Sequence, residues 1–360
     1  MTMTKEVLRY DEKAIMRLRA LYKQYGYTQY RMSRFEEYGL YSENKSFLAS
    51  GDIITFTSAG GKLMALRPDV TLSIVKNTSD SQGMRKLYYN ENVYRPDGHE
   101  FRERMQIGLE CIGDIDIYTV SEVIMLAGRS LSELGKRSCL DISHMGYISG
   151  FLKSADLTIK QKAELILKIK EKNVPEISSI CAKYELADEF RQGIITLATL
   201  YKPYGEALTE LRRLSINEET EDAFRELEDI YSVISRFGFT QDINIDFSIV
   251  NDLNYYNGVI FQGCIDGVPV NVLSGGRYDR LLHRFGKKSG AIGFAVYLDL
   301  LEGTSPPRGV PEFDVLLLYG DNTDANALAG EVAALTAEGR SVRVQRDKPE
   351  NMKYKRLMTM

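Results

Sequence analysis

Two polar side chains in one short segment have the types and the spacing to form a polar binding surface. Gln106, Gly108 and Glu110 follow one another at intervals of two, so on a strand they share one face. The residues between them are apolar and would point to the other side. An amide and a carboxylate directed into one space can hydrogen-bond a cationic group or an N–H group. The alternative is an ordinary strand with a polar face toward solvent.

A second group of candidate side chains lies where a strand passes into a helix. In the segment 66–71, Pro68 fixes its own φ and biases Arg67 toward an extended backbone. Asp69 and Thr71 then stand at the mouth of a short predicted helix. One interpretation is a plain N-cap, because Asp is a preferred residue there. The other interpretation is a recognition loop for a ligand.

Two adjacent tyrosines, Tyr255 and Tyr256, come at the end of a predicted strand. Neighbouring strand residues point to opposite faces, so one ring can pack while the other presents its hydroxyl group. Plain packing of both rings in a sheet is the alternative.

Hydrophobic periodicity and turn residues predict the elements that must position these side chains. In chain order we expect a helix over Asp11–Tyr25, a strand over Tyr27–Met32, a hairpin of Ile53–Ser58 with Lys62–Leu66, strands over Lys86–Tyr94 and Phe101–Ile112, a helix over Ile117–Leu134, a strand over Leu140–His144, a helix over Gly146–Lys153, helices through most of Leu157–Phe237, a strand over Ile243–Phe247, a hairpin from Val259 to Leu273, a helix over Tyr278–Phe285 and a strand over Ala291–Val296. Gly275-Gly276 is expected to turn the chain, and Gly293 to mark a bulge or a close backbone approach.

A separate small unit is predicted at the C-terminal end. The composition of Pro306-Pro307-Arg308-Gly309 is typical of a linker. Beyond it, a strand over Asp314–Tyr319, a helix over Asn322–Ala337 and a strand over Ser341–Gln345 form one βαβ start. The residues Met352–Met360 are expected to be a short tail.

Composition narrows the class of protein. The 360 residues carry a net charge of −4, which argues against a dedicated nucleic-acid binder. We expect no signal peptide and no membrane span, because no apolar run approaches about 18 residues. The four cysteines, Cys111, Cys139, Cys181 and Cys264, form no C-x-x-C pair and lie near none of the histidines. We therefore expect reduced core thiols in a cytoplasmic protein, and no metal or cofactor.

Several motifs in order resemble histidyl-tRNA synthetase, a class II aminoacyl-tRNA synthetase. They are Leu66-Arg67-Pro68-Asp69-Val70-Thr71, Gln106-x-Gly108-x-Glu110, Leu253-Asn254-Tyr255-Tyr256-Asn257-Gly258, Gly275-Gly276-Arg277-Tyr278-Asp279 and Gly293-Phe294-Ala295. The resemblance spans roughly residues 8 to 302. It implies an α+β fold in which an antiparallel sheet is flanked by helices, with a helical insertion and a small C-terminal βαβ piece. The implied domains are 1–155 and 239–304 as two parts of the core, 156–238 as the insertion, and 311–360 as a truncated unit similar to an anticodon-binding domain.

The sequence departs from the synthetase where that family handles adenylate. Asn251-Asp252 stand in place of an Arg-Gly pair, and Asp299-Leu300-Leu301 in place of Glu-Arg-Leu. Neither Asn nor Leu can replace a planar, permanently charged guanidinium at an oxyanion. The loop from Arg95 through Arg102 is also short, and Ser33 replaces a proline of motif 1. The chain thus resembles a synthetase body that kept an amino-acid pocket and lost the ATP chemistry.

This combination resembles the ATP phosphoribosyltransferase regulatory subunits. It implies a subunit, not an enzyme by itself, that activates a short-form catalytic subunit in the first step of L-histidine biosynthesis and mediates feedback inhibition by histidine. A homodimer within a hetero-oligomer is implied, because the segment up to Phe35-Glu36 resembles motif 1, which forms the dimer interface in class II synthetases. No membrane or nucleic-acid partner is implied.

The resemblance also implies roles for individual residues. Asp69, Thr71 and Gln106 would hold the ammonium group of histidine, Glu110 and Tyr256 would meet the imidazole, Tyr255 would form a wall, and Arg95, Arg102 and Arg277 are candidates for residual anion contacts. No catalytic residue is implied. Two alternatives are a divergent active histidyl-tRNA synthetase and a synthetase-like binding module for another partner. Whether the pocket is the regulatory histidine site or a relic is left open.

Overall fold

The computed structural model describes residues 9–45, 48, 53–97, 100–135, 137–250, 256–301, 311–348 and 352–360. The chain divides into two compact units, Tyr10–Glu302 and one that contains the C-terminal residues. Within the described part, no helix is long and apolar enough to cross a bilayer. The expected linker at 306–309, the pair Asn251-Asp252 and Tyr255 lie outside the described residues.

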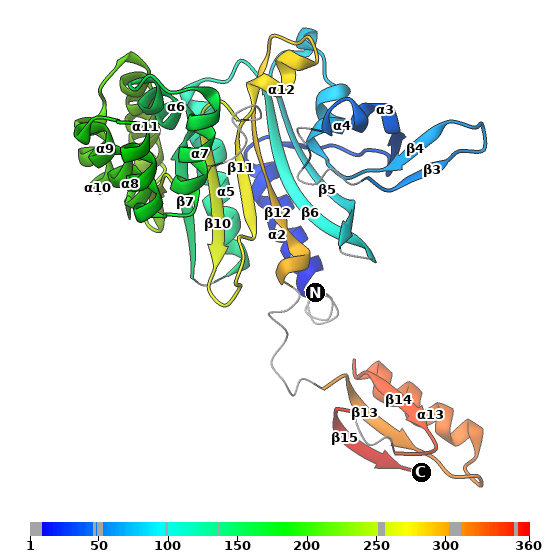
Figure 1. The fold of residues 1–360 in the computed structure, drawn as a ribbon. Helices are drawn as coiled ribbons and strands as arrows, with labels where there is room; N and C mark the ends of the chain where they lie inside the picture. The colour runs from blue at the N-terminus through cyan, green and yellow to red at the C-terminus, as the bar shows by residue number, and fades with distance from the viewer. Residues whose placement is uncertain are drawn as a thin grey trace. The chain divides into compact units, whose positions relative to one another are not determined.

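A nine-stranded sheet forms the centre of the first unit (Figure 1). Its strand order is β1-β5-β6-β12-β11-β10-β7-β9-β8. The strands are β1 (Thr28–Gln29), β5 (Arg85–Asp97), β6 (Glu100–Gly113), β7 (Ser138–His144), β8 (Tyr201–Pro203), β9 (Ile243–Asp246), β10 (Val259–Ile265), β11 (Leu273–Arg277) and β12 (Gly290–Tyr297). All neighbours are antiparallel except the parallel pairs β1–β5 and β7–β9. The predicted α+β fold with an antiparallel sheet is confirmed.

Two long helices cover one face of this sheet. Helix α2 (Tyr10–Gln24) packs against β5 and β6, and helix α5 (Ile117–Leu134) packs against β7, β10, β11 and β12. Helix α5 is buried almost all round, as its apolar composition requires, because it also contacts α2 and α11. Side chains alternate along β6, so Ile107 and Leu109 enter this core while Gln106 and Glu110 lie on the opposite face.

A three-stranded sheet carries the segment that leads to Asp69. Its strands are β2 (Phe35–Glu37), β3 (Thr55–Thr57) and β4 (Leu63–Leu66), in the order β2-β4-β3, with helices α3 (Tyr38–Ser42) and α4 (Thr71–Lys76) nearby in sequence and a 3-10 turn, η2, at Asp80–Gln82. Directly after β4, the side chain of Arg67 is fully buried. Its guanidinium donates to the carbonyls of Ser33 at 2.7 Å and Asn92 at 2.8 Å and to the carboxylate of Glu91 at 2.9 Å. Arg67 thereby fastens the strand-to-helix segment to β5.

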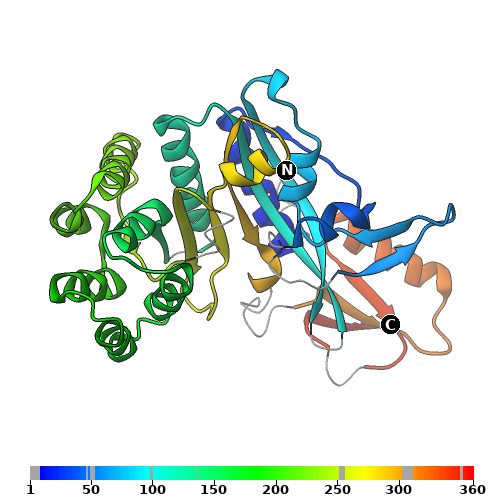
Figure 2. The same cartoon turned by 45° about the horizontal axis from the view of Figure 1, so that its top comes forward.

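A helical insertion gathers beside the β8 end of the large sheet (Figure 1, Figure 2). After α6 (Met145–Lys153) come α7 (Ile159–Lys170), α8 (Val174–Lys183), α9 (Asp188–Thr199), α10 (Tyr204–Leu214) and α11 (Glu218–Arg236). Thr158, Asn173 and Asn217 cap the first turns of α7, α8 and α11 with their side-chain oxygens. The predicted helical segment is confirmed, with one addition. The short strand β8 pairs with β9 and joins the insertion to the sheet.

The second unit contains a parallel sheet of order β14-β13-β15. Its elements are β13 (Phe313–Leu318), α13 (Ala325–Ala337), β14 (Val342–Gln345) and β15 (Tyr354–Thr359). The predicted short tail over Met352–Met360 is wrong, because most of it is β15. Strand β13 is central, and β15 pairs with the backbone N–H and C=O groups on the edge of β13 that β14 leaves open.

The glycine pair Gly275-Gly276 lies inside strand β11, so the predicted turn at this place is wrong. A Cβ at Gly275 would be 2.5 Å from Cβ of Phe294 and would also meet the carbonyl of Gly293. The pair therefore allows neighbouring strands and rings to approach closely. The predicted close approach at Gly293 is confirmed, whereas the strand expected over Tyr27–Met32 shrinks to β1.

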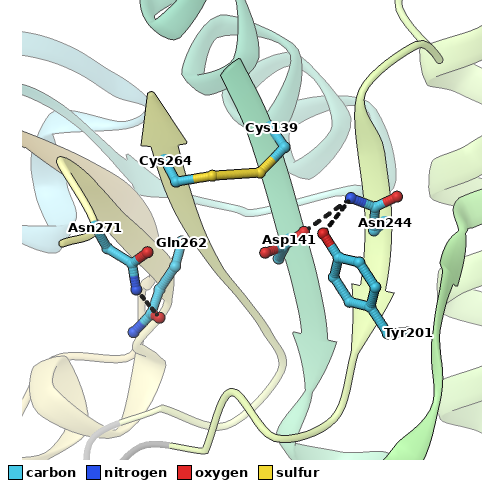
Figure 3. Close-up of a disulfide and its surroundings, with 7 residues drawn as sticks. All are labelled: Cys139, Asp141, Tyr201, Asn244, Gln262, Cys264 and Asn271. Carbon is cyan, nitrogen blue, oxygen red and sulfur yellow. Dashed lines mark hydrogen bonds between the residues drawn. A yellow bond between two sulfur atoms is a disulfide. The ribbon is translucent and has the colours of Figure 1, made fainter. Parts of the chain in front are cut away.

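Two of the four cysteines form a disulfide, so the prediction of four reduced core thiols is wrong for them. Cys139 on β7 and Cys264 on β10 are paired across the antiparallel ladder (Figure 3). Their Cα atoms are 5.4 Å apart, within the range that a disulfide spans. Both are half-buried, whereas Cys111 and Cys181 are buried free thiols. The pairing was hidden because the two residues are 125 positions apart in sequence.

The substitution Arg67→Met is expected to lower the free energy of unfolding by about 3 kcal/mol, because it leaves a carboxylate and two carbonyls without their buried donor. Urea denaturation measures this loss. Lys62→Met is the control, since it removes an exposed ion pair with Glu37 and should change stability little. Equal effects of the two substitutions would contradict the structural role of Arg67.

Candidate ligand-binding site

A cavity of about 80 Å³ lies on the face of the large sheet opposite α2 and α5. It is lined by Asp69, Val70, Thr71, Tyr89, Arg95, Gln106, Glu110, Tyr256, Ser274, Gly275, Tyr278, Gly293, Phe294, Ala295 and Tyr297. A cavity of this volume suits a small ligand better than a large one. Strands β5, β6, β11 and β12 and the start of α4 therefore supply one small polar site.

Glycines on three neighbouring strands make space for this site. Gly108 on β6, Gly293 on β12 and Gly276 on β11 lie on the same face of the sheet. A Cβ at Gly108 would be 2.6 Å from the hydroxyl of Tyr89, and one at Gly293 would collide with the carboxylate of Glu110. Larger residues at these positions would fill the space that the polar side chains now occupy.

Glu110 is the most buried acid of the cavity, with 2% of its surface exposed. Its Oε1 accepts a hydrogen bond from the hydroxyl of Thr71 at 2.8 Å, and its Oε2 accepts one from the hydroxyl of Tyr278. Burial and, to a smaller extent, the charge of Asp69 raise the pKa of Glu110 to about 8, although the hydrogen bonds from both hydroxyl groups oppose this rise. A ligand with a positive charge or an N–H group would favour the ionised carboxylate.

Asp69 lies one position before the N-cap of α4, which is Val70. Its Oδ1 accepts the backbone N–H of Leu72, in the first turn of that helix, at 2.8 Å, and the same carboxylate lines the cavity. Burial raises the pKa of Asp69, while the N–H of Leu72 and the guanidinium of Arg95 oppose the rise. Thr71 also lines the cavity, and its hydroxyl group is engaged by Glu110.

The structure brings together five of the six residues expected to bind histidine. Gln106 is buried and lies opposite Tyr297 across the β6–β12 ladder. Tyr256 is partly buried and lines the cavity, and burial raises the pKa of its phenol. Tyr255 lies outside the described residues. The shared two-residue spacing on β6 thus does direct an amide and a carboxylate into one space.

The three candidate arginines lie in three different places. Arg95 lines the cavity, and its Nε donates to the carbonyl of Pro68 at 2.9 Å. Arg102 is on an exposed part of β6 and is not among the lining residues. Arg277 does not line the cavity either; its Nε donates to Asp279 at 2.8 Å. Only Arg95 is placed to meet an anionic group of a ligand in the cavity.

Four polar lining residues were not predicted as site residues: Tyr89, Ser274, Tyr278 and Tyr297. Tyr278 follows Gly275-Gly276-Arg277 directly, so that motif was the signal that could have found it. Tyr89 lies opposite Gly108 across the β5–β6 ladder, and only strand register reveals it. Among the described residues, no group of three or more His, Cys, Asp or Glu could hold a metal ion.

The raised pKa of Glu110 predicts how stability depends on pH. Between its ordinary value of 4.5 and about 8, the folded chain binds more protons here than the unfolded chain. The free energy of unfolding of the wild type, compared with that of Glu110→Gln, should be greatest below about pH 4.5. It should then fall toward pH 8, by at most about 1.4 kcal/mol per pH unit. Urea denaturation of both proteins from pH 5 to pH 9 tests this. A difference that does not change with pH would show that Glu110 ionises like an exposed glutamate.

Comparison with known proteins places this geometry in a family. Residues 3–301 match the histidyl-tRNA synthetase family. The ATP phosphoribosyltransferase regulatory subunit of Oceanobacillus iheyensis is 29% identical over 311 residues, which cover 84% of this chain and 77% of the relative. That of Caldanaerobacter subterraneus subsp. tengcongensis is 31% identical and covers 79% of this chain and 75% of the relative.

Solved structures share the fold. An ATP phosphoribosyltransferase regulatory subunit/histidyl-tRNA synthetase from Bacillus halodurans has a TM-score of 0.80 at 24% identity and covers 97% of this chain and 93% of that chain. Histidyl-tRNA synthetase from Nostoc sp. PCC 7120 has a TM-score of 0.72 at 19% identity, covering 95% and 83%. A chain of the ATP phosphoribosyltransferase complex from Thermotoga maritima has a TM-score of 0.64 at 17% identity, covering 79% and 96%. The chain has the class II synthetase fold, and it belongs to the family of ATP phosphoribosyltransferase regulatory subunits, which are built like histidyl-tRNA synthetase.

Proposed function

We propose that this chain is the regulatory subunit of an ATP phosphoribosyltransferase in the first step of L-histidine biosynthesis, in the cytoplasm. It assembles with a short-form catalytic subunit, activates that subunit and mediates its inhibition by histidine. The displacement of pyrophosphate from phosphoribosyl pyrophosphate by ATP takes place on the partner. In this proposal the core, 1–155 with 239–304, holds the ligand, and 156–238 and 311–360 are separate domains.

The names of the relatives and the complex from Thermotoga maritima support a catalytic subunit of ATP phosphoribosyltransferase as the partner. The single observation that supports histidine as the ligand is the cavity itself. It presents two carboxylates, Asp69 and Glu110, and the amide of Gln106, all enclosed by tyrosines. An ammonium group suits Asp69 and Gln106, and an imidazole N–H suits Glu110 and Tyr256. Histidine carries both groups.

The described residues also support a binding role in place of amino-acid activation. Leu300 stands where the resemblance expects an arginine, and its side chain packs against the apolar core. The β5–β6 ladder continues to the pair Asp97 and Glu100, so two residues remain for the loop that contacts ATP in the synthetases. An uncharged side chain and a minimal loop cannot stabilise the charge that develops on an acyl phosphate.

A homodimer is proposed on the outer face of the small sheet. Strand register places Phe35, Phe56, Met64 and Leu66 on one face, together with Glu37 at its edge. The rings of Phe35 and Phe56 pack edge to face with centroids 5.5 Å apart. These rings are 50% and 38% exposed, and apolar groups gathered at a surface are typical of interaction sites. A second copy of the chain would cover them.

The double substitution Phe35→Ser, Phe56→Ser is expected to convert the dimer into a monomer in sedimentation velocity experiments. Phe101→Ser is the control, because Phe101 is 72% exposed on a different strand. A wild-type chain that is monomeric, or a dimer that survives the double substitution, would contradict this interface.

The regulatory role is tested by phosphoribosyl-ATP formation with a short-form catalytic subunit, with and without this chain and with added histidine. We expect activity that needs the chain and falls with histidine. Glu110→Gln should preserve activation and raise the histidine concentration for half-inhibition at least about tenfold, since it weakens a buried charged hydrogen bond. Glu103→Gln, on the same strand but exposed, should change neither property.

Two results would overturn the proposal. Histidine-dependent exchange between ATP and pyrophosphate by this chain alone, without effect on the catalytic subunit, would identify a divergent histidyl-tRNA synthetase. Absence of both activities would indicate a binding module for another partner.

A further inference from the structure

The disulfide between Cys139 and Cys264 occupies a place where the backbone suits both a bond and two free thiols. The two residues lie directly opposite each other in the antiparallel ladder of β7 and β10 (Figure 3). Their Cα atoms are 5.4 Å apart, which is ordinary for a disulfide and equally ordinary for any pair of opposite residues in such a ladder. The bond can therefore open or close by rotation of two side chains, without a movement of the strands.

Both cysteines point to the face of the sheet opposite to α5. Gly263, the neighbour of Cys264 on β10, faces α5, because a Cβ there would lie 2.5 Å from Leu131 of that helix. Side chains alternate along a strand, so Cys264 points to the other face, and its cross-strand partner Cys139 points the same way. Both residues are half-buried, so small oxidants and reductants can reach the sulfur atoms.

The side chains beside the pair are polar (Figure 3). On β10, Gln262 accepts a hydrogen bond from Asn271 at 2.6 Å. On β7, Asp141 accepts one from Asn244 at 3.0 Å. The amide of Asn244 also donates to the hydroxyl of Tyr201 at 3.1 Å, and Tyr201 is 51% exposed. Water therefore reaches this part of the sheet, as thiol exchange with small soluble molecules requires.

The other two cysteines of the chain are unsuited to the same chemistry. The side chains of Cys111 and Cys181 are fully buried. Burial raises the pKa of the Cys111 thiol to about 12 and also raises the pKa of the Cys181 thiol. The thiolate is the reactive form of cysteine, so both of these thiols should be inert. Oxidation of the chain should therefore be confined to the cross-strand pair.

We propose that Cys139 and Cys264 are a reversible redox pair, a dithiol that a peroxide oxidises to the disulfide and that small thiols reduce again. The thiolate of one cysteine attacks an oxygen of hydrogen peroxide, the O–O bond breaks, and the thiol proton leaves with the second oxygen as water. The second thiol then attacks the sulfenic acid, and its proton leaves with the hydroxyl group as another water. The two thiols thus lose two electrons to one peroxide. Two glutathione molecules return these electrons through a mixed disulfide.

The closed bond joins the two ends of a long segment of the first unit. The two cysteines are 125 positions apart, and the helical insertion lies between them. A bond across so long a loop restricts the unfolded chain and raises the stability of the folded one. In the cytoplasm, where the proposed function is placed, thiols are kept reduced, so the dithiol is the resting form and the bond closes under oxidation. The redox pair does not depend on the ligand of the cavity.

The test follows the thiols of the full chain by alkylation after acid quenching, with intact mass spectrometry and peptide mapping. We expect Cys139 and Cys264 to be alkylated together after incubation with excess reduced glutathione. After a small excess of hydrogen peroxide, neither should be alkylated, and glutathione should restore both. Cys111 and Cys181 should be alkylated throughout. The oxidised chain should unfold at a temperature at least about 3 °C higher than the reduced chain.

The substitutions Cys139→Ser and Cys264→Ser should each abolish the bond and the shift in unfolding temperature, and the remaining thiol should form a mixed disulfide with glutathione. Cys181→Ala is the matched control, because its thiol is buried in α8 of the insertion, and it should leave closure unchanged. A bond that the folded wild type keeps in excess glutathione would identify a permanent structural disulfide and overturn the proposal. Thiols at 139 and 264 that survive the peroxide would also overturn it.

Discussion

The buried carboxylate of Glu110 is the constraint on which the arrangement of the surrounding elements depends. A carboxylate that is 2% exposed is costly unless donors meet its oxygens, and Glu110 has one hydroxyl donor at each. The strand opposite must lack a Cβ to leave room, and Gly293 supplies that. The elements around the cavity follow from these needs. Helix α4 brings Thr71, the turn before α12 (Asp279–Arg284) brings Tyr278, and Arg67 fastens the first of these to β5.

Such a site is arranged for recognition. The acids and the amide suit ammonium and N–H groups. Of the three candidate arginines, Arg95 lines the cavity and the other two do not, and Leu300 packs against the apolar core. Fold alone does not decide function, since related bodies serve tRNA charging and regulation. The contents of the cavity, together with the family of the chain, support a sensor for histidine whose binding changes the behaviour of a catalytic partner. Coupling of this kind requires only that the ligand bind two states of the assembly with different affinity.

Local pattern in the sequence was enough for most of the fold. The two-residue spacing of Gln106 and Glu110 predicted a shared face because side chains alternate on a strand, and helical periodicity predicted the insertion. Contacts between distant residues could not be found in this way. Tyr278 and Glu110 are 168 positions apart, and Cys139 and Cys264 pair only because β7 and β10 are neighbours in the sheet. Gly275-Gly276 was misread because glycine serves both turns and close strand contacts, and only the neighbours distinguish these uses.

The most direct measurement is a crystal structure of the full chain grown with histidine. We expect histidine in the cavity, with an imidazole nitrogen about 2.7–3.2 Å from a carboxylate oxygen of Glu110 and the ammonium group beside Asp69 and Gln106. A cavity that holds only water, with histidine bound elsewhere on the chain, would contradict the proposed role of this cavity.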